Sequence, residues 1–351
     1  MSPDALLPSA RLPGSQRKIR APFVLDPSLC LYSPQSNVDA LSHPRVAGWL
    51  EKVQHHWGPT PVPGADRGRL ALLLPCTKYK PYPTSREHRA VNAALQAAGW
   101  RPAASYDGPT ELLAVLDDDE HPDLLATAPL VRDGVVLDRF VISEPLALVP
   151  YELTLYADGE QSPATSYDDP GLFVARGTSV SPERSDCTAR PRPDGSWAWG
   201  PAEREAYVVM HNAMAAALTT ALTRLAPHYG RVLAWVSPGL THRSFLADDA
   251  LRLAEGMSRT RRGTSGVLTL RGVLDEAPGL LDVMPDEKQI HAAREALAQR
   301  LEDERRPHGE ASVRAVFARG DGHDTPLGLP ELAALLVARL DEEAEALGVV
   351  G

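Results

Sequence analysis

Cysteine is scarce in this sequence, with three residues among 351. Cys30, Cys76 and Cys187 are too few and too scattered for a disulfide framework or a CxxC metal site. A surplus of basic residues is missing as well, and a formal net charge of -10 repels a polyanion. The scarcity of cysteine argues against a small secreted domain that disulfides hold together. The negative net charge does not favour nucleic acid as a partner.

Long apolar runs are also missing, since no stretch approaches the roughly 20 residues that a membrane-spanning helix needs. The N-terminal segment MSPDALLPSARLPGSQRK lacks the continuous apolar core of a secretory signal. We therefore expect a cytoplasmic protein with no membrane partner. With 43% hydrophobic residues the chain can bury a substantial core, and its length suggests about two domains.

The hydrophobic pattern predicts three regions. Residues 1–37 are rich in Pro and Ser and are expected to form a loosely structured lead-in, residues 38–257 a core, and residues 258–351 a small C-terminal α/β region of unknown role. Helices are expected at 42–57, 84–100, 111–116, 202–225, 244–254, 287–304 and 329–347, and strands at 70–74, 124–130, 139–143, 232–236, 266–270 and 311–318. This alternation predicts a layered α/β fold with a mostly parallel sheet, and residues 158–200 are expected to be a long irregular excursion.

The segment PCTKYKPYPTSREH, residues 75–88, concentrates reactive side chains between a predicted buried strand and a predicted helix. Ligands of α/β sheets usually bind at the carboxyl ends of parallel strands, where Cys76 is expected to lie. Helix N-termini and cations such as Lys78 and Lys80 favour thiolates, so Cys76 is the best candidate nucleophile. A cysteine that is simply buried in a turn is the alternative interpretation.

The helix that follows is expected to begin with a capping box formed by Thr84 and Glu87. Counting back along its apolar stripe by three and four residues places His88 and Ser85 on the face toward the sheet. His88 is therefore a candidate acid, base or orienting group for Cys76. Capping without any catalytic role remains the alternative for these polar residues.

The same fourteen residues match the pattern Pro-Cys-x3-Lys-Pro-Tyr-x2-Ser-x2-His, which marks the core domain of archaeosine synthase, a relative of tRNA-guanine transglycosylases. VISEPLALVPYEL resembles the family's segment after a strand, SHPRVAGWLEKV resembles the helix before its motif, and SYDDP is similar to its YD-P loop. The resemblance covers about residues 40 to 255, which makes 38–257 an archaeosine-synthase-like catalytic core. It implies a three-layer α/β/α fold similar to uracil-DNA glycosylase.

The resemblance implies a transferase that adds an amine, lysine or a similar donor, to the nitrile of a 7-cyano-7-deazaguanine-type base. Because a thiolate can add to a nitrile carbon, we hypothesise that Cys76 is the nucleophile that forms a thioimidate and that His88 is the proton carrier. Ser85 and Lys80 would stabilise developing charge or hold the base. The candidate substrate-binding residues are Tyr82, which could stack on the heterocycle, together with Pro75, Glu144, Glu152 and Asp168.

The sequence departs from the family in ways that bear on the substrate. No N-terminal transglycosylase-like region or C-terminal RNA-binding domain is recognisable, and the bias toward Ala, Arg, Leu and Pro is typical of a high-GC bacterial genome. With the acidic net charge, these departures leave tRNA as a possible substrate that the charge does not support, and a free 7-deazapurine base or nucleoside in a queuosine-related or other specialised pathway is the other candidate. N-glycosidic bond cleavage or exchange on a modified purine, and a non-catalytic module that binds a modified base, are the alternative functions.

Two other clusters contain histidine. His55-His56 and Thr241-His242-Arg243 have no carboxylate or thiol at ligand spacing, so the sequence predicts no metal site. A nucleotide cofactor is not expected either, because GxGxxG and GxxxxGK[ST] do not occur. Arg259 to Arg262 form a basic cluster that could contact phosphates, with pairing to nearby acids as the alternative.

Overall fold

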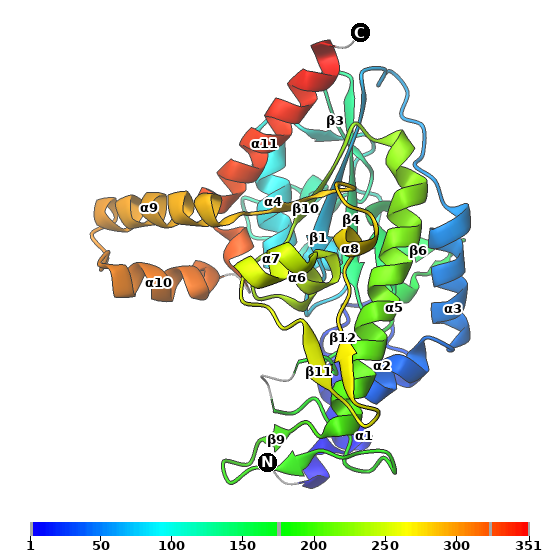
Figure 1. The fold of residues 1–351 in the computed structure, drawn as a ribbon. Helices are drawn as coiled ribbons and strands as arrows, with labels where there is room; N and C mark the ends of the chain where they lie inside the picture. The colour runs from blue at the N-terminus through cyan, green and yellow to red at the C-terminus, as the bar shows by residue number, and fades with distance from the viewer. Residues whose placement is uncertain (1–2, 174–176, 323–324, 350–351) are drawn as a thin grey trace.

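In a computed structural model, which describes residues 3–173, 177–322 and 325–349, the chain forms an α/β fold around a seven-stranded sheet (Figure 1). The first two residues of the predicted lead-in and the last two of the predicted C-terminal region lie outside these ranges. The sheet strands are β1 (Gly68–Pro75), β2 (Arg101–Pro102), β3 (Leu130–Arg132), β4 (Val135–Ser143), β5 (Ala147–Pro150), β10 (Arg231–Trp235) and β13 (Asp282–Met284). Their order is β13-β10-β1-β4-β3-β2, with β5 also paired to β4.

The sheet is mixed and mostly parallel. Strands β4, β1, β10 and β13 run parallel to one another, whereas β2, β3 and β5 are antiparallel to their neighbours. Strand β1 lies at the centre, and the five residues Leu70 to Leu74 are at most 1% exposed. An apolar run without alternation is what a strand covered on both faces requires, which confirms the prediction for residues 70–74.

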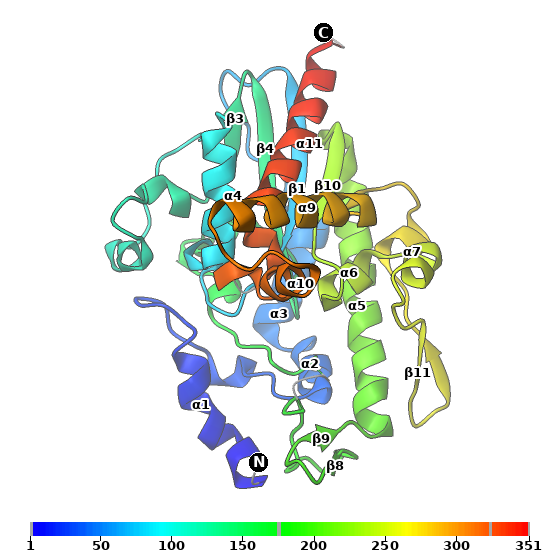
Figure 2. The ribbon, with the colours of Figure 1, turned by 90° about the vertical axis from the view of Figure 1, so that its left-hand side faces the viewer.

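Helices cover both faces of the sheet. The helices are α1 (Pro8–Gln16), α2 (Pro34–Ala40), α3 (Pro44–Glu51), α4 (Arg86–Ala97), α5 (Pro201–Leu225), α6 (Thr241–Leu246), α7 (Asp249–Ala254), α8 (Val273–Glu276), α9 (Glu287–Asp303), α10 (Glu310–Ala318) and α11 (Pro330–Val349). Figure 1 shows α4 and α11 on one side of the sheet and α3 and α5 on the other. Figure 2, seen from the side of α11, shows α9 and α10 lying across it. The layered α/β prediction is therefore confirmed at the level of the class.

Two strand predictions are wrong. Residues 311–318 form helix α10, in which Val313 and Phe317 are buried four residues apart, as a helix requires. Residues 122–125 form a 3-10 turn, and β3 begins only at Leu130. Both segments are short and apolar, and such runs do not distinguish strand from helix by periodicity.

The expectation of a loosely structured lead-in is also wrong for the described residues of 1–37. They form α1 and most of α2, and the peptide around Ile19 pairs with Lys80 in a parallel bridge. The Lys80 N–H donates to the Lys18 carbonyl at 2.9 Å, and the Arg20 N–H donates to the Lys80 carbonyl at 2.8 Å. Backbone pairing to a distant segment leaves no periodic signal in the sequence. The Pro- and Ser-rich composition of this segment therefore led to the wrong prediction.

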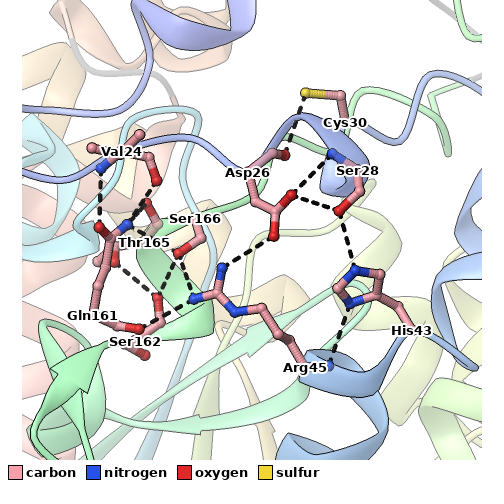
Figure 3. A network of polar contacts seen from close by, with 10 residues as sticks. All are labelled: Val24, Asp26, Ser28, Cys30, His43, Arg45, Gln161, Ser162, Thr165 and Ser166. Atoms are coloured by element: carbon pink, nitrogen blue, oxygen red, sulfur yellow. Dashed lines mark hydrogen bonds and ion pairs between the residues drawn. The ribbon is translucent and has the colours of Figure 1, made fainter.

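Arg45 ties the same N-terminal region to the loop before SYDDP (Figure 3). Its guanidinium donates to Asp26 Oδ2 at 3.2 Å, to the Gln161 carbonyl at 3.2 Å and to Ser166 Oγ at 3.1 Å. The loop 161–169 is thereby held against residues 24–31. The described residues 158–173 and 177–200 are otherwise mostly irregular, as predicted, and residues 174–176 of this predicted excursion lie outside the described residues. Two-residue strands form two short pairs here: β6 (Tyr156–Ala157), just before this stretch, pairs with β7 (Glu160–Gln161), and β8 (Arg190–Pro191) pairs with β9 (Trp197–Ala198).

The basic cluster lies in a hairpin of β11 (Thr260–Arg262) and β12 (Val267–Thr269), which contacts α5. Arg259 forms an ion pair with Asp249, as the alternative interpretation of this cluster expected. Among the described residues, no helix is both long and apolar enough to span a bilayer.

Candidate active site

The carboxyl ends of three neighbouring parallel strands bring three reactive side chains together. Cys76 follows β1, Glu144 follows β4, and His242 lies in α6, which follows β10. Cys76 Sγ lies 3.2 Å from His242 Nε2, and Glu144 Oε2 lies 3.3 Å from the same nitrogen. The distance between Cys76 Sγ and Glu144 Oε2 is 4.0 Å. These positions form the cluster that we call the Cys–Glu–His cluster.

Burial sets the electrostatics of this cluster. Glu144 and His242 are buried, whereas Cys76 is half-buried. Burial opposes charge on both buried groups, but their mutual attraction outweighs it. The pKa of Glu144 is consequently held below its ordinary value, and Glu144 together with Cys76 raises the pKa of His242 well above its ordinary value. An imidazolium and a carboxylate therefore lie beside the Cys76 sulfur at neutral pH.

His88 faces the sheet, as predicted, but its ring bonds to a backbone carbonyl and a tyrosine hydroxyl and not to Cys76. Nε2 lies 3.0 Å from the Pro75 carbonyl and Nδ1 lies 3.2 Å from the Tyr151 hydroxyl, so both ring nitrogens are engaged. Burial lowers the pKa of His88 to about 4, which keeps the ring neutral. His88 thus fixes the end of β1 immediately before Cys76, and His242 instead lies against the Cys76 sulfur.

The helix cap differs from the predicted capping box by one residue. Ser85 is the N-cap of α4, and its Oγ accepts a hydrogen bond from the His88 N–H at 3.2 Å. Thr84 Oγ1 donates instead to the Pro81 carbonyl at 2.7 Å. Ser85 therefore positions His88 through the helix cap, which is a structural task.

Lys80 and Tyr82 belong to a buried polar layer next to the cluster. Lys80 Nζ lies 4.3 Å from the centre of the Tyr167 ring. The Tyr82 hydroxyl donates to Ser143 Oγ at 3.0 Å and lies 2.7 Å from the Tyr167 hydroxyl. Because Tyr82 has no exposed surface, its ring does not lie open for stacking on a base.

Glu152 and Asp168 lie outside the Cys–Glu–His cluster. Strand β5 runs antiparallel to β4 and carries the chain away from the cluster, and Glu152 accepts hydrogen bonds from Trp57 Nε1 and Thr60 Oγ1, both at 3.1 Å. Asp168 accepts from Ser15 Oγ and Lys18 Nζ, both at 2.6 Å, and so anchors the N-terminal region. The neighbouring Asp169 interacts electrostatically with the cluster. Burial and the nearby Glu144 carboxylate raise the pKa of Asp169 to about 7.

A cleft of about 840 Å³ adjoins the motif. Lys78 and Tyr79 line it from the motif, and residues of α1 and the segment after it form the opposite wall. Arg20 and Lys78 both approach the Tyr79 ring, at 4.7 and 5.2 Å from its centre. This cleft offers space for a ligand of nucleoside size beside Lys78 and Tyr79, and Cys76, Glu144 and His242 are not among its lining residues.

Local sequence spacing did not indicate His242 as a partner of Cys76. The structure brings a thiol and a carboxylate to this histidine from segments 166 and 98 residues away, so the Cys–Glu–His cluster can also hold a metal ion. One signal was available: all three residues follow predicted strands of a parallel sheet, whose carboxyl ends share one edge.

No family model, curated protein or solved structure matches this chain. The residues themselves therefore have to support any functional assignment.

Proposed function

We propose that the protein is a transferase that adds an amine to the nitrile of a 7-cyano-7-deazaguanine-type base through a covalent intermediate on Cys76. The observation that supports this most directly is the 3.2 Å contact between Cys76 Sγ and His242 Nε2 at the ligand-binding edge of the sheet. A thiol next to a proton-carrying imidazole is the pairing that covalent catalysis on an electrophilic carbon uses.

In the first step, the Cys76 thiolate attacks the nitrile carbon and a C–S bond forms. One π bond of the nitrile breaks, and its electron pair goes to nitrogen, which takes the proton from His242 Nε2. The product is a neutral thioimidate beside a neutral imidazole. The 3.2 Å distance between sulfur and Nε2 places the proton donor next to the attacked bond.

In the second step, the amine attacks the thioimidate carbon. A C–N bond forms, the C–S bond breaks, and sulfur leaves as the thiolate. The neutral His242 takes the proton that the amine loses, which restores the thiolate and the imidazolium and releases an amidine. Dividing the addition in this way replaces one difficult step by two easier ones.

Glu144 has two tasks in this proposal. Its Oε2 atom, 3.3 Å from Nε2, stabilises the imidazolium that protonates the nitrile nitrogen. Its Oε1 atom is buried and has no hydrogen-bond partner among the described residues, so it can accept a hydrogen bond from the incoming amine. Lys80 adds positive charge close to Glu144 and Asp169.

The substrate in this proposal is a free base or nucleoside, and the amine donor is lysine or a similar amine. The cleft beside Lys78 and Tyr79 has room for such a molecule. The uracil-DNA-glycosylase-like fold is likewise part of the proposal, and four parallel strands with helices on both faces support it. The net charge of -10 still disfavours tRNA.

The test is product formation. Purified protein is incubated with 7-cyano-7-deazaguanine and lysine, and the mixture is analysed by liquid chromatography and mass spectrometry. The expected product has the summed mass of base and amine, because the addition expels nothing. The Cys187→Ser variant is the matched control and should keep the activity, whereas Cys76→Ser should lose it. Equal product from both variants would contradict the assignment of Cys76.

A further inference from the structure

The three donor atoms of the Cys–Glu–His cluster lie within 4.8 Å of one another. In a relay of nucleophile, histidine and acid, the acid binds the ring nitrogen that faces away from the nucleophile. Here Cys76 Sγ and Glu144 Oε2 both approach Nε2 of His242, at 3.2 and 3.3 Å. The other ring nitrogen, Nδ1, is buried and has no hydrogen-bond partner within the described part of the chain. Three donor atoms grouped this closely can act as ligands of one metal ion.

The distances between the donors fit a tetrahedral zinc ion. Zinc bonds of about 2.3 Å to sulfur and about 2.0–2.1 Å to nitrogen and oxygen put neighbouring donors roughly 3.3–3.6 Å apart. The three separations in the cluster are 3.2, 3.3 and 4.0 Å. Shifts of a few tenths of an ångström would therefore accommodate the ion, and three protein ligands would leave its fourth position open.

From this geometry we infer that Cys76, Glu144 and His242 bind a zinc ion or a similar divalent transition metal. The thiolate and the carboxylate together supply two negative charges, which balance the charge of the ion. Sulfur and imidazole ligands favour zinc over magnesium or calcium, which prefer sites made of oxygen atoms.

Metal binding and covalent chemistry exclude each other at Cys76. The ion takes the place of the proton on Nε2, which passes to solvent, and it coordinates the same thiolate sulfur that would attack carbon. The metal-bound form is therefore closed to nitrile addition, and the metal-free form is open. This regulatory consequence rests on the proposed function, whereas the metal site itself does not.

The metal site is tested with the full-length protein after treatment with a chelator. Cobalt(II) is titrated as a spectroscopic probe, and zinc is then added to displace it. One cobalt per chain is expected, with the absorption of a sulfur-to-cobalt charge transfer. Cys76→Ser should abolish this absorption and His242→Gln should weaken binding more than about 100-fold, since even outer-shell partners are worth up to that much. The Cys187→Ser variant should bind as the wild type does.

A second measurement needs no variant. Wild-type protein is alkylated with iodoacetamide with and without one equivalent of zinc, and peptide mass spectrometry follows each cysteine. Zinc should protect Cys76 and leave Cys187 unprotected. Absence of saturable metal binding, or binding that survives both Cys76→Ser and His242→Gln, would overturn the inference. If the protein forms a nitrile adduct but binds no metal, only the metal site is contradicted. If it binds metal but forms no adduct in the metal-free state, only the proposed function is contradicted.

Discussion

His242 Nε2 and Cys76 Sγ lie 3.2 Å apart although 166 residues separate them in the chain. The parallel pairing of β1 with β10, in which Leu73 is opposite Ala234, brings the segments after both strands to one edge of the sheet. The chemistry proposed for the protein depends on this contact, because it gives the thiol a proton donor that the motif itself does not provide.

Replacing His242 with glutamine should slow nitrile addition to Cys76 by roughly 100-fold or more, since a positioned general acid contributes about that much. The rate is measured by single-turnover mass spectrometry of the protein. The matched control is His228→Gln, because His228 is an exposed histidine outside the cluster. Equal rates in wild type and His242→Gln would remove His242 from the mechanism.

Cys76 should react with iodoacetamide faster than Cys30 and Cys187 in metal-free protein near neutral pH. All three cysteines are half-buried, so exposure does not separate them. Burial raises the pKa of Cys30, and it raises the pKa of Cys187 to about 11, whereas Cys76 lies beside an imidazolium. Peptide mass spectrometry over time gives the three rates. Faster alkylation of Cys187 would argue against a reactive Cys76.

His88 should make folding stability sensitive to acid. Its pKa is about 4 in the folded protein and about 6.5 in the unfolded chain, so the unfolded chain binds more protons between these values. Its contribution is fully present above about pH 6.5 and is lost as the pH falls toward 4, which amounts to about 2 kcal/mol between pH 7 and pH 5.

Asp169 titrates in the opposite sense in the same range, because its pKa is raised to about 7. The measurement is therefore a comparison of urea unfolding at pH 7 and pH 5 for wild type and for His88→Gln. At pH 7 the variant should have a lower free energy of unfolding than wild type. Between pH 7 and pH 5 that free energy should fall less in the variant than in wild type, or rise more. An identical pH dependence in the two proteins would show that His88 is not held neutral.

Tyr82→Phe should lower the free energy of unfolding by about 1–2 kcal/mol, because a buried hydroxyl that bonds to Ser143 and Tyr167 is lost. Tyr156→Phe is the control, since Tyr156 is 45% exposed and its substitution should be nearly neutral. Urea unfolding measures both. A neutral Tyr82→Phe would mean that the buried polar layer does not stabilise the fold.

The α/β class and most elements of the core followed from the sequence because their signals are local. Strand β1 is a continuous apolar run and α4 has an apolar stripe, and both patterns reflect burial directly. The docking of residues 18–20 on Lys80 was not predictable, because backbone pairing between distant segments does not depend on side-chain periodicity.

The candidate site was only partly predictable for a related reason. The motif pointed to Cys76, and Glu144 was expected to bind the substrate and not to lie against a histidine. Spacing assigned the histidine partner of Cys76 to the nearest one in the sequence. His88 was correctly expected to face the sheet, yet its two nitrogens bind Pro75 and Tyr151. Which histidine reaches the sulfur depends on strand order, and strand order is a property of the whole sheet.

Covalent addition at Cys76 is tested by intact-protein mass spectrometry of metal-free protein after incubation with 7-cyano-7-deazaguanine and without an amine. Wild type should gain the full mass of the base once per chain, and Cys76→Ala should gain nothing, because the thioimidate forms on that sulfur. An adduct of equal yield in Cys76→Ala, or no adduct in wild type under conditions where the base binds, would contradict covalent nitrile addition at Cys76.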